Sequence, residues 1–244
     1  MSLQLNVFEK KVDAFYLDCE FAEYIANYHT LLSNAEKSGF EFHKKASRYP
    51  LLSTKNSTDK RKETVNHLRR TIYSSFIKDL YEEVCIYLID SMDCIIRHLD
   101  NSGILRVFAE SEIKMTPRQI LEIGTYEQVV DYIAKERFKE MEVAQKRSKN
   151  NNKLNIITQF QNRFGLNIPQ SIVDGAMPYL KLRHIFVHSD GIPDSCFLNE
   201  FPQFQPPKGK KKIPLTHILV EDAYKKVTKL IKEIDNDLET KKLI

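Results

Sequence analysis

The chain has 244 residues, of which 42% are hydrophobic and 29% charged, and it contains only 7 glycines and 9 prolines. This composition excludes a disordered chain, and the length suits one large helical domain better than two unrelated domains. The formal net charge of +4 permits an anionic partner such as RNA without requiring one.

Helical periodicity dominates the first hundred residues. Apolar side chains in the 3–36 segment have the spacing of one helical stripe, so we expect a first helix there. The 37–60 segment is rich in turn-favouring residues and is interpreted as a connector. From about residue 58 to residue 99, apolar residues recur every three or four positions, which predicts a long helix. We expect an N-terminal helix with its connector, 1–57, and a helical core, 58–244.

The next helices are marked by start and stop signals. A Thr-Pro pair at 116–117 is typical of a helix start, because proline at the first helical position loses no hydrogen bond. Gly124 is expected to interrupt this helix before it resumes over 126–146. The polar run at 148–153 predicts a break, followed by a short amphipathic helix at 154–164.

The last third of the chain adds two more expected helices. Pro169 opens one of them, and the Ser-Asp-Gly run at 189–191 should end it. A loop rich in proline and lysine is expected over 193–214, with a possible extended piece at 213–219. The final helix is expected from about Val220. No convincing strand pattern appears, so the predicted fold is an all-α helical bundle.

Cysteine usage and hydropathy bear on the cellular setting. The four cysteines have no C-x-x-C spacing, so neither a zinc site nor a disulfide framework is predicted. The opening residues lack the apolar region of a signal peptide, and no stretch approaches the roughly 18 apolar residues of a membrane span. We expect a cytoplasmic protein without a membrane contact, a metal or another cofactor.

The segment 181–191 concentrates groups suited to phosphodiester chemistry at a helix end, namely Arg183, His184 and His188. Cleavage of RNA by attack of its own 2′-hydroxyl needs a proton acceptor, a proton donor and a cation near the phosphorane. Imidazole can serve in both proton transfers near neutral pH, and guanidinium can hold two phosphate oxygens. Such a mechanism needs no metal.

Helix geometry complicates the pairing of Arg183 with His188. Five residues of ideal helix leave the two positions about 140° apart around the axis. Either the last turn loosens near Gly191 and the arginine reaches round, or a second chain completes the site. A two-fold homodimer would bring two such segments together.

Arg183, followed by a polar residue, three apolar residues and His188, resembles the R-x4-6-H motif of HEPN domains. A looser likeness extends over about 58–240, with the 3–36 helix as an extra element. The resemblance implies a helical bundle, often dimeric, that acts as a metal-independent ribonuclease in toxin–antitoxin or antiviral defence. Residue by residue, it assigns catalytic roles to Arg183 and His188 and places His184 at the polar motif position.

Plainer interpretations exist for the same residues. Cations in a last helical turn interact favourably with the helix dipole, and His184 with His188 has a spacing that can bind zinc, although no third ligand is evident. Asp190 either supports His188 or simply helps to end the helix. A second R-x4-6-H match, Arg61 with His67, lies among charged residues and is interpreted as solvated surface.

A lysine cluster in the 193–214 loop offers a contact for an RNA backbone, although a solvated loop explains it equally well. Its members are Lys208, Lys210, Lys211 and Lys212. The sequence therefore predicts an endoribonuclease acting on single-stranded RNA, with RNA, a second copy and an antitoxin protein as partners. The alternative is a non-catalytic HEPN-type module that binds a protein or nucleic acid.

Overall fold

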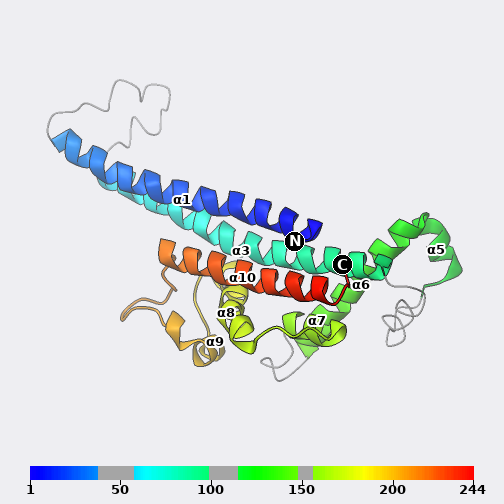
Figure 1. Ribbon diagram of the computed structural model, residues 1–244. Coiled ribbons are helices and arrows are strands. Elements are labelled where there is room, and N and C mark those ends of the chain that lie inside the picture. The colour runs from blue at the N-terminus through cyan, green and yellow to red at the C-terminus, as the bar shows by residue number, and fades with distance from the viewer. Residues whose placement is uncertain (38–57, 99–114, 148–155) are drawn as a thin grey trace. The chain divides into compact units, whose positions relative to one another are not determined.

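The computed structural model describes residues 1–37, 58–98, 115–147 and 156–244. Within these ranges every regular element is a helix and no strand occurs (Figure 1). The predicted all-α class is confirmed, and the possible extended piece at 213–219 is not a strand.

Two long helices come from the first hundred residues. Helix α1 covers Leu3–Lys37 and helix α3 covers Thr58–His98, as their apolar periodicity predicts. Most of the expected connector lies outside the described residues, as does the polar break at 148–153. None of the described helices, including these two, has an apolar run of the length required to cross a bilayer.

The start signal at 116–117 works as expected. Helix α5, Pro117–Ile123, begins with a capping box in which the Thr116 hydroxyl accepts the Gln119 backbone N–H and the Gln119 side chain accepts the Thr116 N–H. Gly124 then adopts a φ of 99°, which favours glycine, and helix α6, Tyr126–Arg147, follows. The predicted interruption at Gly124 is confirmed.

Helix α7 covers Ile156–Phe164 and helix α8 covers Gln170–His188. The end of α8 follows the expected signal, because Asp190 and Gly191 have φ values of 48° and 80° and turn the chain out of the helix. The Gly191 N–H donates back to the Ile185 carbonyl at 3.0 Å, which satisfies one of the last helical acceptors.

The expectation of a plain loop over 193–214 is wrong in part. Helix α9, Ser195–Glu200, begins where the Asp194 carboxylate accepts the Phe197 backbone N–H at 2.7 Å, and a 3-10 turn, η2, covers Pro202–Phe204. Buried phenylalanines anchor both pieces, at positions 197, 201 and 204. The last helix, α10, covers His217–Thr240, so it starts three residues before Val220.

The described chain forms two compact units, each built from separated segments. The first draws on residues 1–11, 81–177 and 226–244. Its core includes Asp235, which is fully buried on α10 and accepts a hydrogen bond from the Tyr87 hydroxyl at 3.0 Å. Lys11 of α1 pairs with Glu83 of α3 at 3.0 Å. The predicted division into 1–57 and 58–244 stays a prediction.

The second unit draws on residues 12–80 and 178–225. Here Glu23 of α1 accepts hydrogen bonds from Tyr73 at 2.6 Å and from Arg69 at 3.3 Å, both on α3. The rings of Tyr16 and Tyr224 stack at 4.3 Å, which joins α1 to α10. All of the sequence-predicted site residues belong to this unit.

Candidate functional site

The carboxyl-terminal half of α8 has a buried side and a solvent-facing side. Leu182, Ile185 and Phe186 are buried in the core of the second unit. His184 and His188 are exposed, and Arg183 is partly exposed. The apolar side therefore fixes the rotation of the helix and directs His184 and His188 outward, whereas the Nε atom of Arg183 is buried and only part of that side chain reaches solvent.

Arg183 and His188 lie at opposite edges of this solvent-facing side. At about 100° per residue, the order around the exposed side is Arg183, Val187, His184 and His188. The two imidazole rings lie one turn apart, with centroids separated by 4.8 Å. The face thus presents a guanidinium at one edge and two adjacent imidazoles at the other.

The expected loosening of the last turn does not occur. Helix α8 remains α-helical through His188, and the Ser189 backbone N–H still donates to the Ile185 carbonyl at 3.1 Å. The irregular backbone begins only at Asp190. Convergence of Arg183 and His188 therefore depends on the length of their side chains or on a second copy, and completion by a dimer stays a prediction.

Asp190 is positioned by cations. Its carboxylate accepts a hydrogen bond from the Lys212 ammonium, and Arg70 of α3 lies 3.8 Å from its other oxygen. The hydrogen bond from Lys212 lowers the pKa of Asp190 below its ordinary value. Asp190 ends the helix and gathers two cations beside it, and support of His188 by this residue stays a prediction.

The lysine cluster divides into two parts. Lys208, Lys210 and Lys211 are exposed around a turn in which the Lys210 N–H donates to the Pro207 carbonyl at 2.9 Å. Gly209 makes this turn possible with a φ of 79°. Lys212 is instead held at the end of α8 by its hydrogen bond to Asp190. This contact links Lys212 directly to the turn that follows the motif.

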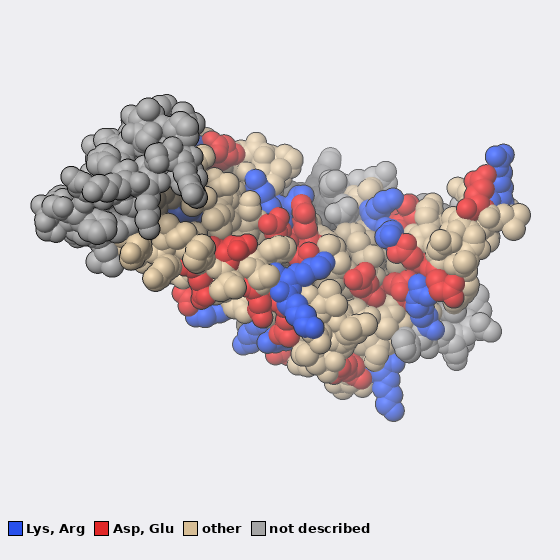
Figure 2. Space-filling model, turned by 90° about the horizontal axis from the view of Figure 1, so that it is seen from above, with Lys and Arg blue, Asp and Glu red and all other residues tan. Residues whose placement is uncertain are grey.

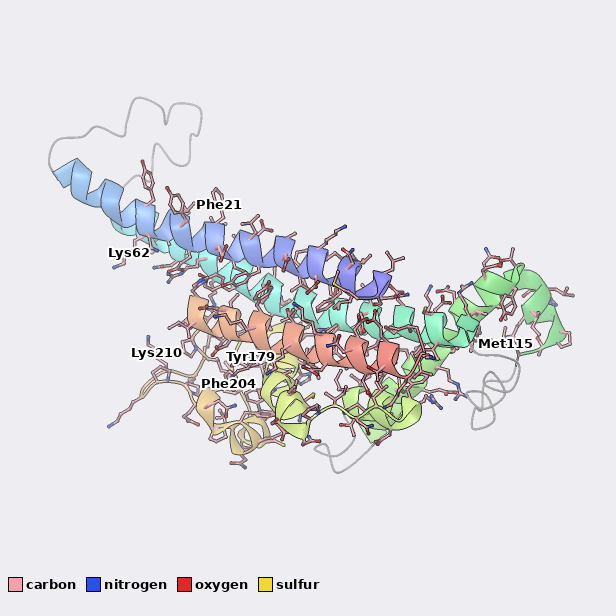
Figure 3. All side chains as sticks on the ribbon, viewed as in Figure 1. Phe21, Lys62, Met115, Tyr179, Phe204 and Lys210 are labelled. Atoms are coloured by element: carbon pink, nitrogen blue, oxygen red, sulfur yellow. The ribbon has the colours of Figure 1, made fainter. Side chains whose placement is uncertain are left out.

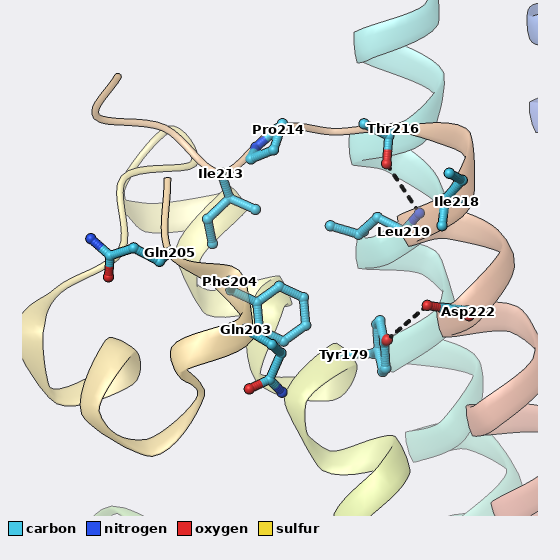
Figure 4. A pocket seen from close by; sticks show the side chains of 10 residues that line it. All are labelled: Tyr179, Gln203, Phe204, Gln205, Ile213, Pro214, Thr216, Ile218, Leu219 and Asp222. Carbon is cyan, nitrogen blue, oxygen red and sulfur yellow. Dashed lines mark hydrogen bonds between the residues drawn. The ribbon is translucent and has the colours of Figure 1, made fainter. Parts of the chain in front are cut away.

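A pocket of about 290 Å³ opens between the carboxyl-terminal half of α8, the η2 turn and the start of α10 (Figure 4). The rings of Tyr179 and Phe204 meet edge to face at 5.6 Å, and the Tyr179 hydroxyl donates to the Asp222 carboxylate at 3.4 Å. Gln203 and Gln205 add amide groups at the lining. The pocket combines aromatic surface with hydrogen-bonding groups of both kinds, which suits a planar polar ligand.

Contacts connect this pocket to the motif. Tyr179 precedes Arg183 by one helical turn, a rise of about 6 Å on the same side of α8. On the opposite wall, the Ile213 backbone N–H donates to the Gly191 carbonyl at 2.9 Å. The pocket and the motif therefore share helix α8, and the Ile213 backbone joins the pocket wall to the turn that ends this helix.

Sequence reasoning missed Arg70 and the pocket. Arg70 reaches Asp190 from a different helix, and no local pattern indicates that approach. Tyr179 was detectable in principle, because it lies four residues before Arg183 on a predicted helix. Asp222 and Phe204 come from elements whose packing the sequence does not specify.

No group of three or more histidine, cysteine, aspartate or glutamate side chains with the geometry of a metal site occurs in the described ranges. His184 and His188 lie close enough to be two ligands of a zinc ion, but no third candidate ligand joins them within these ranges.

Comparison of the chain with known protein families, curated proteins and solved structures found no match. The likeness to HEPN domains accordingly rests on the motif segment around Arg183 and His188.

Proposed function

We propose that the protein is a metal-independent endoribonuclease that cleaves single-stranded RNA at the exposed end of α8. The observation that carries the proposal is the solvent-facing side of α8, with Arg183 at one edge and His184 and His188 at the other. This side offers one group to bind phosphate oxygens and two to move protons. A toxin or antiviral role, with an antitoxin partner, follows from the HEPN resemblance and belongs to the same proposal.

The proposed reaction is an internal transfer at phosphorus. One imidazole removes the proton of the 2′-hydroxyl, and the 2′-oxygen attacks the adjacent phosphorus atom. The bond to the 5′-oxygen breaks, and that oxygen takes a proton from an imidazolium. Arg183 stabilises the extra negative charge on the phosphorane oxygens. The products carry a 2′,3′-cyclic phosphate and a 5′-hydroxyl, and no oxidant, metal or water enters the step.

Cations near the motif support binding of a polyanion. Arg70 and Lys212 are gathered at Asp190, and Lys208, Lys210 and Lys211 are exposed on the neighbouring loop. Electrostatic contacts of this kind bind RNA without reading its sequence and weaken as salt increases.

The aromatic pocket supports a preference for particular bases. Its volume of about 290 Å³ accommodates one nucleobase, and the aromatic edges of Tyr179 and Phe204 offer packing surface for it. The Asp222 carboxylate accepts hydrogen bonds, so it would favour a base that presents N–H groups, such as guanine. We expect Asp222→Asn to change the base preference near the cleavage site while leaving cleavage itself intact.

The deciding experiment is cleavage of a labelled single-stranded RNA in excess EDTA. Wild-type protein should produce fragments with 2′,3′-cyclic phosphate ends, and an RNA with 2′-O-methyl groups should resist cleavage. Arg183→Lys should lose most of the activity because a lysine cannot bind two phosphate oxygens in a fixed plane. Absence of cleavage by the folded wild-type protein over a range of RNAs would favour a non-catalytic binding module instead.

A further inference from the structure

Helix α1 has an apolar side that stays exposed in the part of the chain that the structure describes. Its inner side is conventional, because Phe8, Val12, Cys19 and Ala22 are buried. On the opposite side, Leu17, Phe21 and Tyr24 are 63%, 62% and 64% exposed. Figure 3 shows Phe21 on the side of α1 that faces away from α3.

Most exposed apolar residues of α1 recur with the spacing of a seven-residue repeat. Alternating steps of four and three residues define eight positions from Leu3 to Tyr28 on the continuous helix. All eight are exposed, and six carry large apolar side chains: Leu3, Val7, Leu17, Phe21, Tyr24 and Tyr28. Lys10 and Ala14 occupy the remaining two. On an ideal helix these positions lie within about 100° of one another, so they form a single stripe.

A helix at a protein surface is normally polar on its outer side. Single exposed apolar residues need no explanation, but an extended and mainly apolar stripe marks an interaction site. The seven-residue repeat specifies the kind of partner, because it is the pattern by which one α-helix packs along another. We infer that the outer stripe of α1 pairs with the same stripe of a second copy in an antiparallel coiled coil.

Charges on α1 favour the antiparallel arrangement. Parallel pairing in register would place Lys10 opposite the partner's Lys10. In an antiparallel pair centred between Ala14 and Leu17, Lys10 lies beside the partner's Glu20 instead. Figure 2 looks onto the α1 side, where red and blue side chains both appear on the tan surface. The exposed Glu20 offers Lys10 an acidic neighbour on the partner.

Side-chain size also fits this register. Leu17 faces the partner's Ala14, and Tyr24 faces the partner's Val7, so large residues oppose small ones. Phe21 faces the partner's Lys10, whose ammonium can lie against the ring as a cation–π contact. Two-fold symmetry repeats each contact, which makes the interface self-complementary.

The exposed area of the stripe is close to the area that each partner buries in a stable dimer interface. An aromatic side chain offers about 150–250 Å² for burial, and the six large residues together expose on the order of 600 Å². With the flanking polar side chains, this approaches the roughly 800 Å² per partner of a standard interface. The pairing depends on α1 alone, so it stands or falls separately from the proposed nuclease.

The first test is the oligomeric state of the full chain, measured by light scattering after size-exclusion chromatography at micromolar concentrations. We expect a dimer for the wild type and a monomer for Phe21→Glu, with at least about 100-fold weaker association because the carboxylate would be buried in the seam. The matched control is Leu121→Glu, which changes an 81% exposed leucine on α5 and should stay dimeric. Circular dichroism should show that both variants remain folded.

The second test concerns orientation. Lys10→Glu and Glu20→Lys should each weaken the dimer about tenfold or more, and the double exchange should restore it, since only the antiparallel register pairs these positions. A monomeric wild type, or a dimer that survives Phe21→Glu, would overturn the proposed interface. Failure of the double exchange to restore association would overturn the antiparallel register.

Discussion

The imidazole rings of His184 and His188 lie 4.8 Å apart, one helical turn from each other on the exposed side of α8. Neither ring belongs to the core, because the apolar side of the same helix is formed by Leu182, Ile185 and Phe186. Two solvent-exposed imidazoles contribute little to folding, so their removal should affect chemistry more than stability.

We therefore expect His188→Ala to reduce the initial rate of RNA cleavage at least about 100-fold, the usual effect of losing a general acid or base. His184→Ala should reduce it about tenfold or more if this residue supports the site. The control is His67→Ala, which removes an exposed histidine of α3 from the second motif match and should change the rate less than twofold. Equal activity of all three variants would exclude the exposed α8 side as the active site.

Much of the helical framework could be predicted because it depends on local patterns. The apolar spacing of α1 and α3, the Thr116 cap and the glycine at 124 each determine their own element. Helix α9 was missed because flanking prolines suggested a loop, although Asp194 provides a normal helix cap. Its stability comes mainly from burial of phenylalanines, which depends on tertiary packing.

The candidate site was predicted only in part, for a related reason. The motif at Arg183 and His188 is contiguous in the sequence, and its exposed placement follows from the helical pattern. The approach of Arg70 to Asp190, and of Asp222 to Tyr179, joins residues far apart in the chain. One sequence contains no local signal for such contacts.

Asp190 should control the charge at the end of α8. The hydrogen bond from Lys212 lowers its pKa, so this carboxylate stays ionised in the folded protein to lower pH than in the unfolded chain. Its contribution to stability is complete above its unfolded pKa of about 3.9 and is lost as pH falls through the lower folded value.

Asp190→Asn should consequently lower the melting temperature slightly at pH 7, with the difference from wild type vanishing at acidic pH. Asparagine tolerates the positive φ at this position, so the backbone should not be strained. The same variant should bind RNA a few times more tightly at low salt, because it removes a negative charge beside Arg70 and Lys212. Unchanged RNA affinity would show that RNA does not approach this end of the helix.

The buried hydrogen bond between Tyr87 and Asp235 in the first unit should contribute more to the stability of the fold than the exposed contacts of Asp190. The Tyr87 hydroxyl donates to Asp235 at 3.0 Å, and both side chains are almost completely buried. Tyr87→Phe would leave the Asp235 carboxylate without this donor and should lower the free energy of unfolding by about 1–3 kcal/mol. Urea denaturation can measure the change, with Tyr126→Phe at an exposed tyrosine of α6 as the neutral control. Equal losses for the two variants would contradict this account.

The cysteines should differ strongly in reactivity. Cys196 is exposed on α9, whereas Cys19 is buried on α1, and burial, together with the nearby Asp18 charge, raises the pKa of Cys19 to about 12. At pH 8 an ordinary thiol is ionised to about a quarter, but a thiol with this pKa is ionised only to about one part in ten thousand. Brief iodoacetamide treatment of the folded protein, followed by peptide mass spectrometry, should label Cys196 and leave Cys19 unmodified.

Denaturation in urea should make the two sites equally reactive, because unfolding removes both the burial and the fixed neighbouring charges. Cys196→Ser is the matched variant, and it should eliminate the rapid phase of labelling without altering the slow one. Rapid modification of Cys19 in the folded chain would mean that α1 separates readily from the core of the second unit. Both sides of α1 would then be accessible. Pairing through the outer stripe requires that α1 be held with that side outward, so it would no longer be expected.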